Sequence, residues 1–197
     1  MRASKIAIIL LGRPGSGKDT QAELLAKKFG LVHLISSKII EAALKKGKGA
    51  NIEKERQLQK NGFLVSSKFV SALIMAEIKS IAGRGKGIVM SGSPRTLPEI
   101  KDELPLLEKL YGENSYFFHI AINPKEVYIR NLKRHRKDLP ELDTRKIIKK
   151  RLTVFMEATW PVIKYLKSKK RITDINGEQK IRKIHQDILK ALKNAWQ

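Results

Sequence analysis

The chain has 197 residues and a net charge of +22, with 41 Lys and Arg against 19 Asp and Glu. Its length suits one domain with a sizeable core, and its apolar fraction of 42% argues against general disorder. The chain contains no cysteine, which excludes disulfides and Cys-based zinc sites, and its four histidines are scattered. Lysines are spread over almost every segment and aromatic residues are few, which favours a solvated basic surface over a dedicated nucleic-acid face.

An apolar strand is predicted at Ile6–Leu11, and a glycine-rich segment, Gly12–Thr20, follows it directly. The glycines let successive backbone N–H groups point inward, and a helix predicted to follow presents its positive end to the same place. Lys18 adds a mobile positive charge. This order indicates a phosphate-binding loop, although Asp19 stands directly after the lysine, where the strict pattern has Ser or Thr, and Thr20 comes one step later. The alternative is a Gly/Pro-rich turn that binds no ligand.

The same N-terminal strand superficially resembles the start of a secretion signal. The apolar run is too short for one, and Gly12-Arg13-Pro14 interrupts it. No stretch of the sequence approaches the length needed to span a bilayer. The expected location is therefore the cytoplasm.

The rest of the chain alternates between strands and helices. Further strands are expected at 31–35, 87–92, 116–122 and 171–175, and helices at 36–47, 51–60, 67–83, 97–111, 125–137, 143–166 and 181–196. Pro161 is expected to kink the longest helix. Short apolar strands between helices predict an α/β fold, with a parallel sheet covered on both faces. Ligands of such sheets bind at the C-terminal ends of the strands, where the glycine loop lies.

Four arginines are predicted to lie near the glycine loop. Arg95 follows a strand end, and Arg130 and Arg134 are one helical turn apart. Arg151 lies on the next helix. The short connection at 138–142 would fold this helix back, so that Arg151 lies over the site. Because guanidinium groups bind phosphate bidentately, the set indicates phosphate chemistry at this edge of the sheet. The alternative for any one of them is a solvated surface charge.

The chain resembles the adenylate kinase and UMP/CMP kinase family of nucleoside monophosphate kinases over nearly its whole length. The resemblance rests on Gly12–Gln21, His33–Ser37 followed by Ala42-Ala43, Gly92–Thr96, Arg130 with Arg134, and Lys150–Leu152. It implies a P-loop three-layer α/β/α fold with a five-stranded parallel sheet, in a single domain spanning 1–197. The core would comprise 1–35, 66–133 and 146–197, with a helical acceptor-binding lobe at about 36–65. A short lid without a zinc-binding insertion would lie at about 134–145.

The resemblance also implies ATP with Mg²⁺ as the donor and a nucleoside monophosphate, first of all AMP, as the acceptor. The residues expected to hold ATP are Gly12, Pro14, Gly15, Ser16, Gly17, Lys18, Asp19, Thr20 and Arg130. The residues expected to be catalytic are Lys18, Arg95, Arg134 and Arg151. The acceptor would contact Ser36, Glu41, Val65, Gly92, Arg95 and Glu99, and Mg²⁺ would lie near Thr20 and Ser91 through waters. The chain is expected to act as a monomer on small nucleotides, with no membrane partner and with nucleic acid not favoured.

Several residues differ from the family pattern. Glu41 stands where the family has arginine, Ser91 where it has aspartate, Ser93 where it has phenylalanine and Glu99 where it has glutamine. Asp19 stands where the family has glycine. Carboxylates at 41 and 99 would repel an acceptor phosphate if they pointed at it. Two alternatives therefore stand beside the kinase: an ATP-binding relative with another acceptor or no catalysis, and a basic nucleic-acid-associated NTP-binding protein.

Overall fold

The computed structural model describes residues 5–60, 63–134 and 143–194. Its centre is a five-stranded sheet in the order β2-β3-β1-β4-β5, in which every pairing is parallel. The strands are β1 (Ala7–Leu11), β2 (Val32–Ile35), β3 (Ile88–Ser91), β4 (Ser115–Ala121) and β5 (Ile172–Asn176). Each predicted strand is confirmed to within one residue at either end, and so is the predicted α/β fold.

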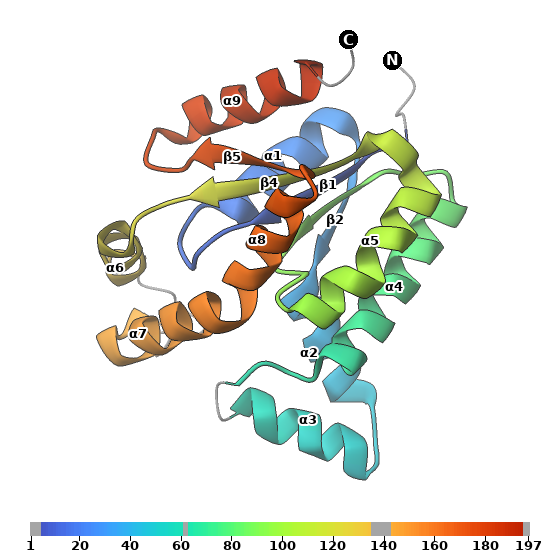
Figure 1. Ribbon diagram of the computed structural model, residues 1–197. Coiled ribbons are helices and arrows are strands. Elements are labelled where there is room, and N and C mark those ends of the chain that lie inside the picture. Colours follow the sequence, from blue (N-terminus) through green and yellow to red (C-terminus); the bar gives the residue numbers. More distant parts are fainter. Residues whose placement is uncertain (1–4, 61–62, 135–142, 195–197) are drawn as a thin grey trace.

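Helices cover both faces of this sheet (Figure 1). The helices of one face are α1 (Lys18–Phe29) and α9 (Ile181–Asn194), and those of the other are α4 (Ser67–Gly83), α5 (Leu97–Tyr111) and α8 (Trp160–Ser168). The molecule thus has the three layers that the sequence predicts.

The central strand β1 contributes to a hydrophobic core on each face. Ile8 and Leu10 pack with Leu25 of α1 on one face. Ile9 packs with Ile74 of α4 on the other. All five side chains are fully buried, which explains why the strand is a continuous apolar run rather than an alternating one.

Two helices, α2 (Ser36–Lys46) and α3 (Ala50–Lys60), extend away from the sheet (Figure 1). The guanidinium group of Arg56 on α3 donates to the carbonyl oxygens of Leu44 (2.6 and 2.9 Å) and Gly47 (2.8 Å) at the end of α2. The Glu55 carboxylate accepts a hydrogen bond from the Ser66 N–H (2.8 Å), just before α4. These contacts hold together the segment expected to form the acceptor-binding lobe; its binding role stays a prediction.

The chain between β4 and β5 forms α6 (Pro124–Leu132), α7 (Arg145–Val154), a π-helical turn (Phe155–Thr159) and α8. The π-helical turn comes just before Pro161, where the kink was predicted, because proline lacks an N–H and its ring crowds the preceding turn.

The helix predicted at 125–137 is shorter than expected. It ends at Leu132, and the Arg134 N–H bonds the Asn131 carbonyl (3.2 Å) in a turn beyond it. The prediction that Arg130 and Arg134 share one helical face is therefore wrong. Residues 135–142, which contain most of the predicted lid, lie outside the described residues.

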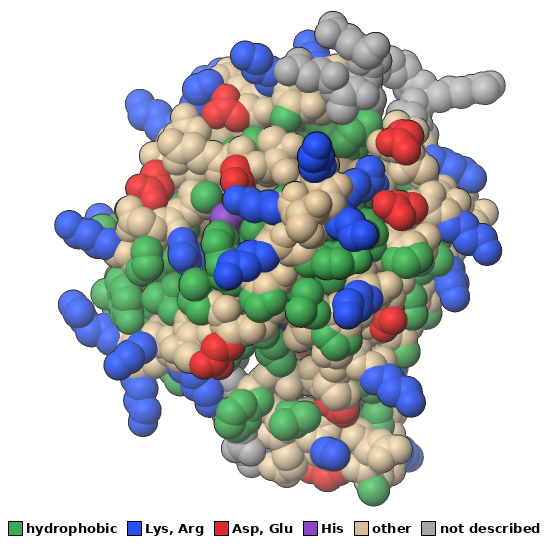
Figure 2. Space-filling model, viewed as in Figure 1, with side chains coloured by type: hydrophobic (Ala, Val, Ile, Leu, Met, Phe, Trp, Pro, Cys, Tyr) green, Lys and Arg blue, Asp and Glu red, His purple; other side chains and the backbone are tan. Residues whose placement is uncertain are grey.

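Lysine and arginine side chains are distributed across the whole face seen in Figure 2. They do not gather there into a single patch, which agrees with the solvated basic surface expected from the sequence. Among the described residues, no helix combines the length and the apolar character that crossing a membrane requires.

Candidate active site

The phosphate loop joins β1 to α1 in the conformation that its glycines predict. Gly15 has φ of +80° and Gly17, the residue before α1, has φ of +90°. A Cβ on Gly15 would lie 2.5 Å from Nδ2 of Asn131, so a larger residue does not fit. The Ser16 hydroxyl is buried and has no hydrogen-bond partner among the described residues. An anion at the start of α1 would satisfy it together with the loop amides.

Two side chains that were not predicted as site residues, Asn131 and Arg13, hold this loop in place. Asn131 of α6 is fully buried and donates from Nδ2 to the Pro14 carbonyl (3.2 Å). The Arg13 guanidinium donates to the Ile122 carbonyl and lies 5.6 Å from the centre of the Phe155 ring. The loop is thus fixed from α6 on one side and from the π-helical turn on the other.

Lys18 lies at the start of α1, where burial lowers the pKa of its ammonium group to about 8. The charge of Asp19 opposes this shift, whereas the charges of Arg95, Arg151 and Arg134 add to it. Charges affect a pKa in this way only when they lie near the group. The structure therefore brings together Lys18 and the three arginines expected to be catalytic, although they come from four separate segments of the chain.

Arg130 has a different environment. Its Nε donates to Glu126 (2.6 Å) and its Nη2 to the Gly177 carbonyl beyond β5 (2.8 Å). Its Cβ lies 3.6 Å from where a Cβ of Gly15 would be. Arg130 thus lies beside the phosphate loop, with its guanidinium group directed toward the end of β5.

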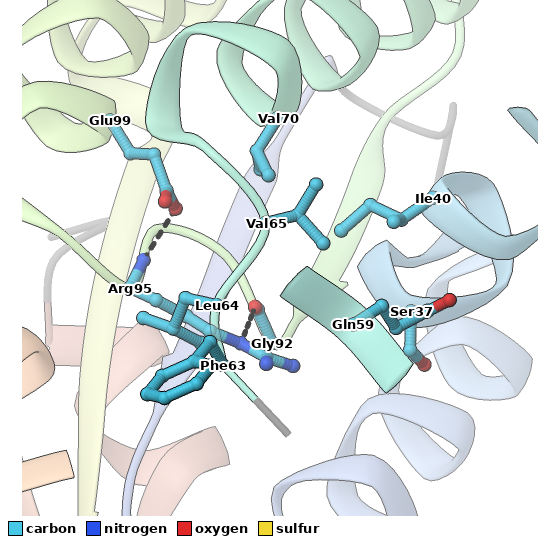
Figure 3. A pocket seen from close by; sticks show the side chains of 10 residues that line it. All are labelled: Ser37, Ile40, Gln59, Phe63, Leu64, Val65, Val70, Gly92, Arg95 and Glu99. Carbon is cyan, nitrogen blue, oxygen red and sulfur yellow. Dashed lines mark hydrogen bonds between the residues drawn. The ribbon is translucent and has the colours of Figure 1, made fainter. Parts of the chain in front are cut away.

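A cavity of about 100 Å³ lies between the α2–α3 lobe and the segment that follows β3 (Figure 3). Ile40, Val65 and Val70 form an apolar wall, and Arg95 crosses the cavity on the other side. Phe63 is 58% exposed beside Arg95. An apolar wall with one cation suits a ligand that has both a flat apolar part and an anionic part.

Most of the residues predicted to contact the acceptor lie at this cavity. Val65, Gly92, Arg95 and Glu99 line it. Gly92 is in close contact with Ser36, because a Cβ on it would lie 2.6 Å from the Ser36 hydroxyl. That hydroxyl is buried with no partner in the described part of the chain. Glu41, in contrast, is exposed on α2 and does not line the cavity.

The Glu99 carboxyl group is used within the protein as a helix cap. Its Oε1 accepts from the Thr96 hydroxyl (3.0 Å) and its Oε2 from the Arg95 N–H (2.7 Å). Thr96 precedes α5 and accepts in turn from the Glu99 N–H (3.4 Å). The arrangement is a variant of the capping box, in which the carboxylate accepts from the N–H of Arg95 rather than from that of Thr96, and its Thr-x-x-Glu pattern can be found in the sequence. Burial raises the pKa of Glu99, while the hydrogen bonds that it accepts from Arg95, Thr96 and Ser93 oppose this shift.

A second buried acid lies beneath Glu99. The Ser93 hydroxyl donates to Oε1 of Glu103 (2.8 Å) and lies 3.4 Å from Oε2 of Glu99. Burial raises the pKa of Glu103 to about 8. The serine that replaces the family's phenylalanine is thus the hydrogen-bond partner of an acid that stays protonated at neutral pH.

The residues predicted near Mg²⁺ lie at the first turn of α1 and the end of β3. Thr20 is exposed there. The Ser91 hydroxyl lies 3.1 Å from Nε2 of His33, and its interaction with the Asp19 carboxylate lowers the pKa of that group. The described residues contain no group of three or more His, Asp or Glu side chains that could hold a metal ion. This oxygen set fits Mg²⁺ that keeps several waters and takes its other ligands from phosphate.

One cation site at the phosphate loop and a second at the cavity, both at one sheet edge, define a P-loop kinase for a small phosphorylated acceptor. The family model "Adenylate kinase" matches residues 10–171, and the chain belongs to this family. Adenylate kinases of known sequence align over almost the whole chain. That of Chlamydia pneumoniae is 30% identical, and the alignment covers 93% of this chain and 96% of the relative. That of Bacteroides fragilis is 28% identical and covers 94% and 97%, and that of a Synechococcus species is 28% identical and covers 95% and 99%.

Proposed function

We propose that this adenylate kinase family member transfers the γ-phosphate of ATP to AMP and so forms two molecules of ADP. The observation that carries the proposal is the convergence of Arg95, Arg134 and Arg151 on Lys18 at the phosphate loop. Arg95 also lines the neighbouring cavity, so one cation faces both substrates. A set of four cations is suited to holding two polyanions in contact.

In this proposal the loop amides and Lys18 hold the β- and γ-phosphates of ATP, while Arg95 holds the phosphate of AMP. An oxygen of that phosphate attacks the γ-phosphorus, and the bond from the γ-phosphorus to the β–γ bridging oxygen breaks. Because the attacking oxygen is already anionic, no general base is needed. Arg134 and Arg151 neutralise the charge on the transferring group. When bound, Mg²⁺ neutralises the β- and γ-oxygens.

The cavity would receive only part of the acceptor, since a whole small-molecule site usually measures about 300 Å³ or more. The base would lie against Ile40, Val65 and Val70, with its phosphate directed to Arg95. Closure of the lid predicted at 134–145 would exclude water, so that ATP is not hydrolysed. The absence of cysteine fits a reducing compartment, and we propose a cytoplasmic monomer that uses ATP with Mg²⁺.

The proposal is tested by mixing the purified chain with MgATP and, separately, AMP, CMP, UMP, GMP or dAMP, and following ADP in a coupled assay. Transfer is expected to be fastest with AMP and to require both substrates. Lys27→Ala, which removes an exposed cation of α1, should keep its rate. ATP binding in calorimetry without transfer to any acceptor would contradict the proposal and favour a regulatory ATP-binding protein.

A further inference from the structure

Asp19 is an acid placed among the cations of the site. Its charge acts on both Lys18 and Arg95. The charges of Lys18, Arg134 and His33 act on Asp19 in return. The Asp19 carboxylate therefore lies close to the cations that are expected to hold the phosphates of ATP, and the sequence offers no reason for an acid there.

Ser91 and His33 lie near the Asp19 carboxylate and act on its charge. Ser91 is the last residue of β3, is 1% exposed and lies between Leu10 of β1 and Ile35 of β2 in the sheet. Its hydroxyl lies 3.1 Å from Nε2 of His33, and its interaction with the Asp19 carboxylate lowers the pKa of that group. If the His33 Nε2 carries the proton, it donates to Ser91. The carboxylate is thus flanked by polar side chains from two neighbouring strands.

A carboxylate in this place has opposite effects on two forms of the nucleotide. It repels the phosphates of metal-free ATP at short range. A divalent cation between the carboxylate and the phosphates converts that repulsion into attraction, because Mg²⁺ prefers carboxylate and phosphate oxygens. Lys18 and the arginines already supply the positive charge that attracts phosphate. Their presence therefore does not explain why the site also contains an acid.

We infer that Asp19 is the carboxylate that binds, directly or through water, the Mg²⁺ carried by ATP, and that Ser91 and His33 orient it. The inference rests on the proposed ATP site and adds to it the residue that selects the metal-bound nucleotide. It also links two departures from the family pattern. The aspartate expected at 91 and the glycine expected at 19 are replaced by Ser91 and Asp19, whose side chains interact. A carboxylate at either position would reach the same volume.

Calorimetry of ATP binding, with EDTA and with excess Mg²⁺, tests the inference without turnover. The measured quantity is the ratio of the Kd for free ATP to the Kd for MgATP. Asp19→Asn should lower this ratio about 10- to 100-fold, by weakening MgATP binding and tightening free ATP binding. The control is Glu77→Gln, which removes an exposed acid of α4 on the other face of the sheet and should leave the ratio unchanged. If Asp19 only neutralises Lys18, Asp19→Asn will tighten both ligands equally, and the inference is overturned.

A swap of the two residues gives a second test. Asp19→Gly alone should lose the preference for MgATP, and the double variant Asp19→Gly with Ser91→Asp should regain it. Electron paramagnetic resonance of Mn²⁺ with ATP should show the same loss and recovery of bound Mn²⁺. A double variant that folds and binds ATP but shows no recovery would overturn the inference while leaving the proposed function in place. Failure of the wild-type chain to bind ATP in either form would overturn both.

Discussion

Replacing Glu103 with glutamine tests the pair of buried acids, Glu99 and Glu103, that share the Ser93 hydroxyl. Glu103 is 0% exposed, and burial raises its pKa from 4.5 to about 8. Between these values the folded protein keeps the proton and the unfolded chain releases it. The contribution of Glu103 to the free energy of unfolding is therefore greatest below pH 4.5. It falls as the pH rises toward 8, by about 1.4 kcal/mol per pH unit. From pH 5 to pH 7 this group removes about 2.7 kcal/mol from the free energy of unfolding.

The Glu103→Gln variant has no proton to lose, so its stability relative to the wild type should rise by about 2.7 kcal/mol between pH 5 and pH 7. Urea unfolding at pH 5, 6 and 7, followed by circular dichroism and analysed only where the m-values agree, measures this difference. Any constant offset from the buried amide cancels. As a control, Glu77→Gln removes an exposed carboxylate of α4 and should stay within about 0.5 kcal/mol of the wild type at every pH. Parallel pH curves for Glu103→Gln and the wild type would refute the reasoning.

Three further predictions concern the loop and its cations. Lys18 has a pKa of about 8 and must be charged to hold phosphate. The affinity for MgATP should therefore be constant below pH 8 and fall by up to tenfold per pH unit above it. Calorimetry of Lys18→Met should not show this fall with pH. Arg95→Ala should lower kcat/KM for AMP by about 10²- to 10³-fold with an unchanged Kd for ATP, and loss of ATP affinity instead would place Arg95 on the donor side. Gly15→Ala should destabilise the fold by about 1–3 kcal/mol in urea unfolding, because its φ is positive and its Cβ would meet Asn131. Gly83→Ala, which meets open space at the end of α4, is the matched control.

The strands and the phosphate loop could be predicted from local patterns. A strand of a parallel sheet is buried on both faces, so runs such as Ile6–Leu11 are continuously apolar and their limits are sharp. The loop was readable because Gly15 and Gly17 are needed for its conformation and not only for ligand binding. The Thr-x-x-Glu capping pattern of Thr96 and Glu99 can likewise be found in the sequence.

The remaining features depend on tertiary contacts that no local pattern contains. The end of α6 at Leu132 could not be predicted, because the sequence continues with the polar residues expected of an exposed helix. Asn131 looks like an ordinary helix residue until its bond to the Pro14 carbonyl is known. The meaning of Asp19 likewise depends on Ser91, which is distant in the sequence and adjacent only in the folded sheet.

The most direct test of the account is to follow the γ-phosphate of ATP itself. The purified chain is incubated with MgATP labelled at the γ-phosphate and with unlabelled AMP, and the products are separated. The account predicts that the label appears at the β-position of ADP formed from AMP, at a rate that Arg95→Ala greatly reduces. Label found only in inorganic phosphate, or label that remains in ATP at high protein concentration, would contradict it.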